Sequence, residues 1–307
     1  MTPRRILLTG ATGFVGGHLG PALRRGFPDA LLHAAAADVT DADALAAEVA
    51  ALAPDACVHL AAIAAIPQAE HDPDTAWRVN LGGTLHLARA IQRHAPDSVL
   101  LFASSADVYG RSMAAGLPVD ERALLAPTNV YAASKAAADL ALGAMVGRGL
   151  RVVRVRAFNH TGPGQSEAFV IPAFARQAAA IAWAGAAPVL RVGNLDAERD
   201  FLDVRDVCAA YVACLRHAEA VLADGILNIA SGSPRQLRDV MAELLALAAI
   251  APTIELDPAR IRPSDIPRSC GDAARARRLL GWSPVVPWEQ TLRDVLDDWR
   301  RRITAAG

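Results

Sequence analysis

The chain has 307 residues, and its 31 basic and 32 acidic side chains leave a formal net charge of −1. This length is enough for one doubly wound domain with a smaller lobe or for two full domains. The near-zero charge gives no field that would draw nucleic acid or an anionic membrane surface, so neither is an expected partner. Any site for an anionic ligand therefore has to be a local group of basic side chains.

Strands and helices alternate along the first half of the chain. The apolar pattern predicts strands over 6–9, 30–33, 56–60, 99–104 and 151–156. One helix is expected over 14–23, and a second is expected to begin at Thr40, whose hydroxyl would cap it with Asp43 as the third-position acid. This alternation predicts a parallel sheet with helices on both faces.

The connection after the second strand is short. The run 34–41 leaves no room for a separate helix and third strand before the helix at Thr40, so the usual third unit of such a sheet is expected to be abbreviated. Beyond Arg156 the pattern becomes irregular, and Ser233 with Pro234 is expected to cap and open a later helix. Loop-rich sequence of this kind suits a lobe that closes over a substrate.

Glycines mark the first turn of the expected sheet. Gly10, Gly13 and Gly16 follow the apolar run 6–8 and lead into the helix over 14–23. This order of strand, turn and helix seats a pyrophosphate on a helix amino terminus. In a chain with 22 glycines such a segment can also be an ordinary turn.

A tyrosine and a lysine stand four residues apart in a helix-forming stretch. Tyr131 and Lys135 would lie on one helix face, where the ammonium can lower the phenol pKa and ready it for proton transfer. A Tyr-x-x-x-Lys pair alone is more often a solvated helix face. Together with the glycine segment, it predicts nicotinamide chemistry on a carbonyl or an alcohol.

Four scattered cysteines show no spacing typical of metal ligands, so buried free thiols and no metal site are expected. No apolar run reaches the roughly 18 residues that a membrane span needs. The amino terminus enters the first strand without a signal-like segment, and a cytoplasmic protein is expected.

Five motifs in chain order carry a resemblance to a known family. They are Gly10-x-x-Gly13-x-x-Gly16, His59-Leu60-Ala61-Ala62, Val79-Asn80-Leu81-Gly82-Gly83-Thr84, Ser104-Ser105-Ala106-Asp107-Val108-Tyr109-Gly110 and Tyr131-x-x-x-Lys135. With them the chain resembles, over nearly its whole length, the extended short-chain dehydrogenase/reductase superfamily of nucleotide-sugar epimerases, dehydratases and reductases. Members that serve as sensors or structural subunits usually lose the Tyr or the Lys, and both remain here.

The resemblance implies catalytic roles. Ser105 would hydrogen-bond the reacting oxygen, Tyr131 would donate or accept its proton, and Lys135 would hold the cofactor ribose and tune Tyr131. The implied cofactor-binding positions are Gly10, Thr12, Gly13, Phe14, Val15, Gly16, Asp38, Val39, Leu60, Ala61, Ala62, Asn80, Tyr131 and Lys135. Asp38 resembles the family's adenine-contacting Asp, and it could also be a simple turn acid.

The carboxyl-terminal half points to one branch of the superfamily. The segments 158–165, 192–201 and 262–267 are similar to those of GDP-mannose 4,6-dehydratases and, still more, of GDP-4-keto-6-deoxy-mannose reductases. In that branch two arginines grip the sugar nucleotide's diphosphate and an acid binds its ribose. The implied substrate-binding positions are Ser105, Asn159, Val170, Arg176, Asn194, Arg199, Arg262 and Asp265. An ordinary surface ion pair remains the alternative for each arginine.

The resemblance implies both the fold and the division of the chain into two domains. It implies an α/β fold with a Rossmann-type doubly wound parallel sheet and a smaller mixed α/β carboxyl-terminal substrate lobe. Residues 1–160, with a return segment over about 198–230, would form the dinucleotide-binding domain. Residues 161–197 and 231–307 would form the nucleotide-sugar-binding lobe. A homodimer is implied through the helix around residues 77–95 and the helix that carries Tyr131.

The favoured reaction is NAD(P)H-dependent reduction of the 4-keto group of a GDP-4-keto-6-deoxyhexose to a GDP-rhamnose type of product, with Tyr131 as proton donor. Asp107 lies where dehydratases of this group keep a Glu, so it is a candidate catalytic residue and GDP-mannose 4,6-dehydration stays open. Asp107 could equally cap the following turn. The activities of a GDP-heptose 4-keto reductase and of a nucleotide-sugar 4-epimerase stay open as well.

The choice of cofactor is poorly marked. After the second strand the chain has His33 followed by four alanines, with neither the acid that favours NAD nor the Arg that favours NADP. Reductive members of the family often use NADPH, so NADP is weakly preferred over NAD. The expected partners are this cofactor and a GDP-linked sugar.

Overall fold

The computed structural model describes residues 2–261 and 266–306. Its larger domain is built on a six-stranded parallel sheet. The strand order is β2-β1-β3-β4-β5-β9. The strands are β1 Arg5–Thr9, β2 Leu31–Ala34, β3 Ala56–His59, β4 Val99–Ala103, β5 Val152–Ala157 and β9 Ile226–Ile229. All five expected strands are confirmed, with bounds that agree to within two residues. The expected doubly wound fold is confirmed as well.

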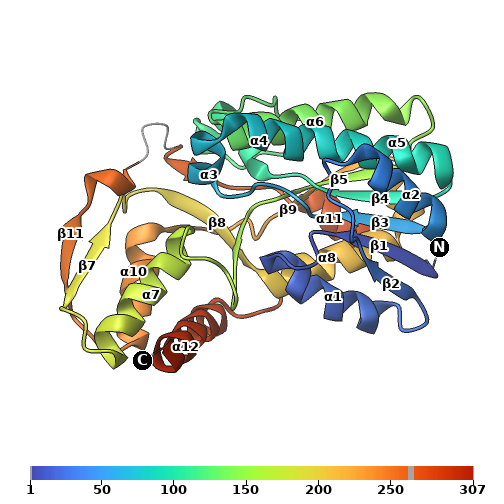
Figure 1. Ribbon diagram of the computed structural model, residues 1–307. Coiled ribbons are helices and arrows are strands. Elements are labelled where there is room, and N and C mark those ends of the chain that lie inside the picture. The colour runs from blue at the N-terminus through green and yellow to red at the C-terminus, as the bar shows by residue number, and fades with distance from the viewer. Residues whose placement is uncertain (1, 262–265, 307) are drawn as a thin grey trace.

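Helices cover both faces of this sheet (Figure 1). The helices α1 Phe14–Gly26, α8 Val204–Arg216 and α11 Ala274–Leu280 share one apolar cluster with Ile6 and Leu8. The helices α2 Ala42–Leu52, α5 Thr84–His94 and α6 Val130–Val146 share another with Leu7. Successive strand residues point to opposite faces, and each fully buried leucine contributes about 1.5–3 kcal/mol.

A smaller lobe is built around β8 Glu198–Asp203. Its other strands are β6 Asn159–Thr161, β7 Val189–Val192, β10 Pro234–Gln236, β11 Thr253–Leu256 and β12 Arg268–Ser269. β8 pairs in parallel with β6 and β12 and antiparallel with β10, while β7 pairs with β11. The helices α7 Val170–Trp183, α10 Leu237–Leu247 and α12 Trp288–Ala306 enclose an apolar cluster of their own. The exact domain bounds stay a prediction.

Short helical segments complete the chain. They are α3 Ile66–His71, α4 Pro73–Trp77, the π-helical turn η1 Arg78–Gly83, the 3-10 segments η2 Ala106–Met113 and η3 Pro258–Arg260, and α9 Ala218–Leu222. The expected helix around residues 77–95 is therefore composite, with a π turn between α4 and α5. Such turns often mark functional sites.

Two expected helix starts are wrong. Asp41, not Thr40, caps α2, because its carboxylate accepts a hydrogen bond from Ala44 N at 3.0 Å, while the Thr40 hydroxyl donates to Asp38 at 2.8 Å. Ser233 and Pro234 do not open α10. Residues from Pro234 onward instead pair with β8 as an edge strand, whose first position tolerates a proline, and the helix begins at Leu237.

Two further expectations are confirmed. The chain passes from β2 directly to α2, so the third unit is abbreviated and β2 forms the sheet edge. Cys57, Cys208, Cys214 and Cys270 are buried free thiols.

Within residues 2–261 and 266–306, no helix is long and apolar enough to cross a membrane.

Candidate active site

Ser105 and Tyr131 meet beyond the carboxyl end of β4. Ser105 caps η2, and its Oγ accepts a hydrogen bond from Asp107 N at 3.1 Å. Tyr131 lies in the first turn of α6, which is capped by Asn129 through a 2.8 Å hydrogen bond from Ala132 N. The Ser105 and Tyr131 side chains are hydrogen-bonded to each other. The chain between them therefore folds back and brings two hydroxyl groups together at one point of the site.

The electrostatics of Tyr131 differ from the expectation. Burial raises the pKa of its phenol, the Asp107 carboxylate raises it further, and the hydrogen bond with Ser105 lowers it in part. The predicted lowering by Lys135 is therefore wrong for this structure. A phenol with a raised pKa is fully protonated near neutral pH, so Tyr131 carries a proton to donate but is a weaker acid than a free phenol.

Lys135, one turn after Tyr131 on α6, is buried against Phe102 of β4. Its side chain is 3% exposed, and its ammonium lies 4.1 Å from the centre of the Phe102 ring. Burial lowers the pKa of Lys135 to about 7, and the Asp139 carboxylate raises it in part. The cation–π contact offsets part of the cost of burying the charge. Lys135 can therefore change its charge in the neutral range.

His59, which belongs to the second family motif but was given no role from the sequence, is buried and links the ends of β1 and β3 to the start of α5. His59 Nδ1 lies 2.7 Å from Thr9 Oγ1, and His59 Nε2 lies 3.0 Å from Thr84 Oγ1. Burial lowers the pKa of His59 to about 3, and the Lys135 charge lowers it too. His59 is therefore neutral and holds β1, β3 and α5 in register.

The glycine turn fits a dinucleotide. Gly10 has a φ of +68°, and a Cβ there would lie 2.7 Å from Ala61 N. A Cβ on Gly16 would lie 2.3 Å from Gly10 O. Helix α1 has no acidic residue in its first turn, and its N-cap Gly13 offers no side chain to the amides. The glycine turn and the backbone amides at the start of α1 could therefore hold the diphosphate of NAD(P).

The other predicted cofactor positions lie at the start of α1 and after β2 and β3. Asp38 is exposed, and Thr40 N and Oγ1 both donate to it at 2.8 Å, which together lower its carboxyl pKa. Val39 packs near Gly83 of η1. The remaining predicted positions in this region, which are half-buried or exposed, are Thr12, Phe14 and Val15 at α1 and Leu60, Ala61 and Ala62 after β3.

Asn80 acts within the fold itself. Its side chain is 0% exposed, its Oδ1 accepts a hydrogen bond from Ile63 N at 2.8 Å, and its amide donates to Ser134 Oγ at 2.9 Å. Asn80 thus fixes the segment after β3 against α6. Its effect on a cofactor would come through this segment.

The predicted substrate positions lie in the smaller lobe. Asn159 begins β6, which pairs with the strand that carries Arg199. Arg199 Nη1 donates to Ile266 O at 2.7 Å. Val170 begins α7 and is half-buried, whereas Arg176 on the same helix is exposed and pairs with a nearby glutamate.

Three predicted substrate positions remain. Asn194 is exposed and accepts a hydrogen bond from Asp196 N at 2.9 Å, which is a turn contact. Arg262 and Asp265 lie outside the described residues. Of the predicted segment 262–267, the structure describes Ile266 and Pro267, and the Ile266 carbonyl accepts the hydrogen bond from Arg199.

A contact that the sequence reasoning missed joins the two lobes. β6 and the loop that follows it lie against the start of α1, where the Phe14 ring and the ring of His160 in β6 stack with centres 6.3 Å apart. His18 Nε2 is 2.8 Å from Pro163 O. The predicted substrate segment therefore touches the glycine turn directly.

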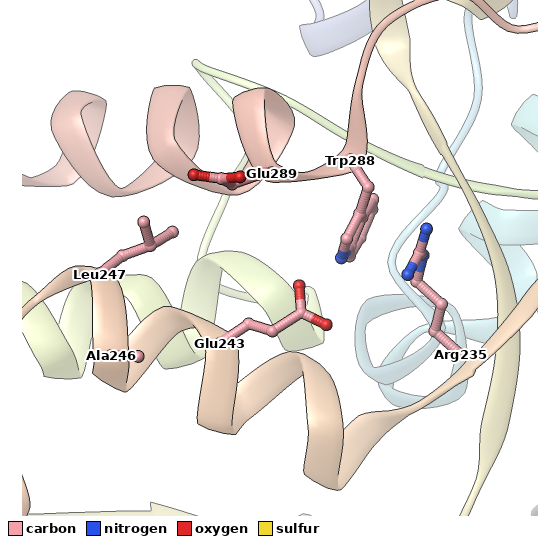
Figure 2. A pocket seen from close by; sticks show the side chains of 6 residues that line it. All are labelled: Arg235, Glu243, Ala246, Leu247, Trp288 and Glu289. Carbon is pink, nitrogen blue, oxygen red and sulfur yellow. The ribbon is translucent and has the colours of Figure 1, made fainter.

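A pocket of about 480 Å³ lies elsewhere, between α10 and the start of α12 (Figure 2). Its lining is Arg235, Glu243, Ala246, Leu247, Trp288 and Glu289. Figure 2 shows the Arg235 guanidinium beside the Trp288 ring, and their separation is 4.7 Å. The pocket shares no residue with the candidate active site.

The fold, the glycine turn and the set of Ser105, Tyr131 and Lys135 define an NAD(P)-dependent oxidoreductase of the extended short-chain dehydrogenase/reductase type. Residues 24–295 match the family described as GDP-mannose 4,6 dehydratase. The chain belongs to this family, whose members act on nucleotide sugars.

Relatives with known names or structures are similar over nearly their whole length. A GDP-6-deoxy-D-mannose reductase of Pseudomonas aeruginosa is 39% identical over 98% of both chains. The structure of RMD from Pseudomonas aeruginosa complexed with NADPH superposes with a TM-score of 0.87 and 37% identity, covering 97% of this chain and 99% of that one. A UDP-glucose 4-epimerase from Thermus thermophilus in complex with NAD has a TM-score of 0.82 and 28% identity, covering 96% and 99%.

Proposed function

We propose that the protein reduces the 4-keto group of a GDP-4-keto-6-deoxyhexose to give a GDP-6-deoxyhexose of the GDP-rhamnose type. The hydrogen-bonded pair of Ser105 and Tyr131 beyond the carboxyl end of β4 carries this proposal, because it offers two O–H groups to one carbonyl oxygen. The similarity to a GDP-6-deoxy-D-mannose reductase over 98% of the chain supports the sugar and the direction of the reaction.

The side chains supply the proton and stabilise the charge. When bound, the nicotinamide supplies a hydride to carbon 4 of the sugar. Tyr131 gives its proton to the oxygen on that carbon, and Ser105 hydrogen-bonds the same oxygen as its negative charge grows. Both side chains are at least partly buried, so each hydrogen bond is stronger than it would be in water. The tyrosinate then regains its proton from solvent.

NADPH is the proposed cofactor, supported by the NADPH complex of the similar reductase. One feature of the structure argues for NADH. Glu48 reaches the turn after β2, where its carboxylate accepts hydrogen bonds from Ala36 N at 2.9 Å and Ala37 N at 3.0 Å and lies 2.7 Å from His33. An acid at this turn disfavours a 2′-phosphate. Rates with both cofactors separate the two possibilities.

Arg199 and Arg262 are proposed to bind the GDP diphosphate, and Asp265 its ribose. Planar guanidinium groups match phosphate oxygens, which a chain with almost no net charge must supply locally. Asn159, Val170, Arg176 and Asn194 are proposed to complete the sugar-nucleotide site. The contact of Arg199 with Ile266 O supports the first assignment.

Dehydration of GDP-mannose is the second candidate. Asp107 is close enough to Tyr131 to raise its pKa, so a carboxylate lies beside the proton-donor pair as a dehydratase would need. The family match is to a dehydratase, which favours the same possibility. A GDP-heptose reductase and a 4-epimerase remain as outcomes of the test.

A homodimer through α4, α5 and α6 is proposed, and a cytoplasmic location stays a prediction. Trp77 is 38% exposed and Leu140 59% exposed, which leaves apolar surface on these helices. Light scattering after size exclusion would measure the mass directly.

The decisive experiment mixes the protein with freshly made GDP-4-keto-6-deoxy-mannose and either NADPH or NADH. Matching loss of cofactor absorbance and a gain of about two mass units, the mass of the hydride and proton, are expected. Tyr131→Phe should lower the rate by about 10²–10⁴-fold while keeping the fold. Water loss from GDP-mannose with no keto reduction would identify a dehydratase, and NAD retained through purification would point to an epimerase.

A further inference from the structure

A buried charge cluster lies behind the candidate active site. Asp139 is 0% exposed and follows Lys135 by one turn of α6. Its carboxylate accepts hydrogen bonds from Ser104 Oγ at 2.7 Å, from Arg156 Nε and Nη2 at 3.0 and 2.9 Å, and from Arg154 Nη1 at 3.2 Å. Burial opposes ionisation of this carboxyl, but the bonds and charge of Arg156 outweigh it and lower the pKa of Asp139. Asp139 is therefore a fixed anion.

The hydrogen bond between Ser104 and Asp139 joins the two elements that carry the catalytic side chains. Ser104 directly precedes Ser105 at the end of β4, while Asp139 shares α6 with Tyr131 and Lys135. Arg156 extends the connection into β5. This buried contact lies two turns along α6 from Tyr131 and ties the helix to the strand end beside Ser105. Small errors in the separation of Ser105 from Tyr131 are costly to catalysis.

Charge is distributed unevenly around this cluster. Arg154 and Arg156 from β5 act on Asp139, and Lys135 acts on His59 from β3. Tyr109 of η2 and Glu121 lie beyond Arg156, and Asp107 of η2 acts on Tyr131 at the start of α6. Asp139 is the anion that raises the pKa of Lys135. Without its charge, two arginines and a lysine would remain together in a buried space.

We propose that Asp139 is a positioning residue of the active site, which holds the Ser105 strand end against the Tyr131 helix and balances the charge of Lys135. This inference rests on the proposed reduction for its kinetic consequences. The charge balance itself is a property of the chain without substrate.

Lys135 gives the test an unusually clean probe. Of the 31 basic side chains in the chain, Lys135 alone is a lysine. Arg remains charged at every accessible pH, whereas a lysine can titrate. Protein labelled with ¹³C at the lysine ε-carbon therefore gives one side-chain signal, and its shift against pH measures the pKa of Lys135 directly.

Three variants separate the two roles of Asp139. Asp139→Asn should lower the Lys135 midpoint by about one pH unit or more and reduce kcat about tenfold or more. Asp139→Glu keeps the charge and should restore most of the midpoint. Ser104→Ala removes the tie but not the charge, so kcat should fall several-fold while the midpoint stays. Asp206→Asn is the control for the loss of a buried carboxylate elsewhere in the fold. The Asp206 carboxylate accepts hydrogen bonds from Val285 N and Val286 N.

Two results would overturn the inference. One is a folded Asp139→Asn protein whose Lys135 midpoint matches the wild type. The other, decisive even if Asp139→Asn does not fold, is an unchanged kcat in Ser104→Ala. If the wild type reduces no GDP-4-keto sugar, the proposed function fails, but the titrations still decide the charge role of Asp139.

Discussion

The Lys135 ammonium packs on the face of the Phe102 ring, 4.1 Å from its centre, where burial lowers the pKa of Lys135 to about 7. If reduction needs the protonated lysine, kcat/KM should fall about tenfold per pH unit above that pKa, since the charged form is lost as pH rises. Initial rates between pH 5.5 and 9.5 measure this. Lys135→Arg keeps its charge, so its rate, although lower, should not show the same fall.

A methyl group on Gly10 should disrupt the glycine turn. At a φ of +68°, its Cβ would lie 2.7 Å from Ala61 N, so Gly10→Ala should cost about 2 kcal/mol or more and weaken NADPH binding. Gly17→Ala is the matched control on α1, where nothing lies within 4 Å of the added Cβ, and a gain of about 0.5–1 kcal/mol is expected. Urea unfolding and NADPH fluorescence measure the two effects. Equal behaviour of the variants would contradict the argument.

Removing the guanidinium of Arg199 should weaken substrate binding. Charged hydrogen bonds contribute about 1.5–3 kcal/mol, so Arg199→Met should raise the KM for the GDP-sugar about tenfold or more. Arg238→Met removes an exposed arginine that pairs with Asp196 and should leave KM unchanged. Steady-state kinetics decide the matter, and an unaltered KM in Arg199→Met would remove this residue from the site.

Asp107 distinguishes reduction from dehydration. In a reductase, Asp107→Asn removes a negative charge that raises the pKa of Tyr131 and should change the reduction rate by less than about fivefold. In a dehydratase the same change would abolish water loss from GDP-mannose. Mass spectrometry of both reactions, run on both proteins, tests Asp107. A hundredfold loss of reduction would instead show that Asp107 takes part in the proposed proton transfer.

Local pattern was enough for the five strands predicted for the parallel sheet. The association of Ser105 with Tyr131 was instead implied by the resemblance of their two motifs to a known family. The two wrong helix starts have different origins. The Thr40 hydroxyl donates to Asp38 only two residues away, so this competitor was visible in the sequence. Pro234 pairs with Asp200 of β8, a distant strand that local capping rules do not consider.

Electrostatics could not be predicted in the same way. The pKa of Tyr131 depends on how far burial outweighs neighbouring charges, and helix spacing says nothing of burial. The Glu48 carboxylate reaches the turn after β2 from a separate helix, so the acid sought in that turn was missed. Asp139 did leave a signal in the sequence, since it stands one helical turn after the single lysine.

All four thiols are at most 2% exposed, and they lie in three parts of the fold's interior. Cys57 belongs to the sheet, Cys208 and Cys214 to α8, and Cys270 follows β12 of the smaller lobe. A thiol reagent can reach them only in molecules that have opened locally, so four alkylation rates would map the free energy of opening region by region. The four cysteines thereby report local unfolding in the regions that contain them.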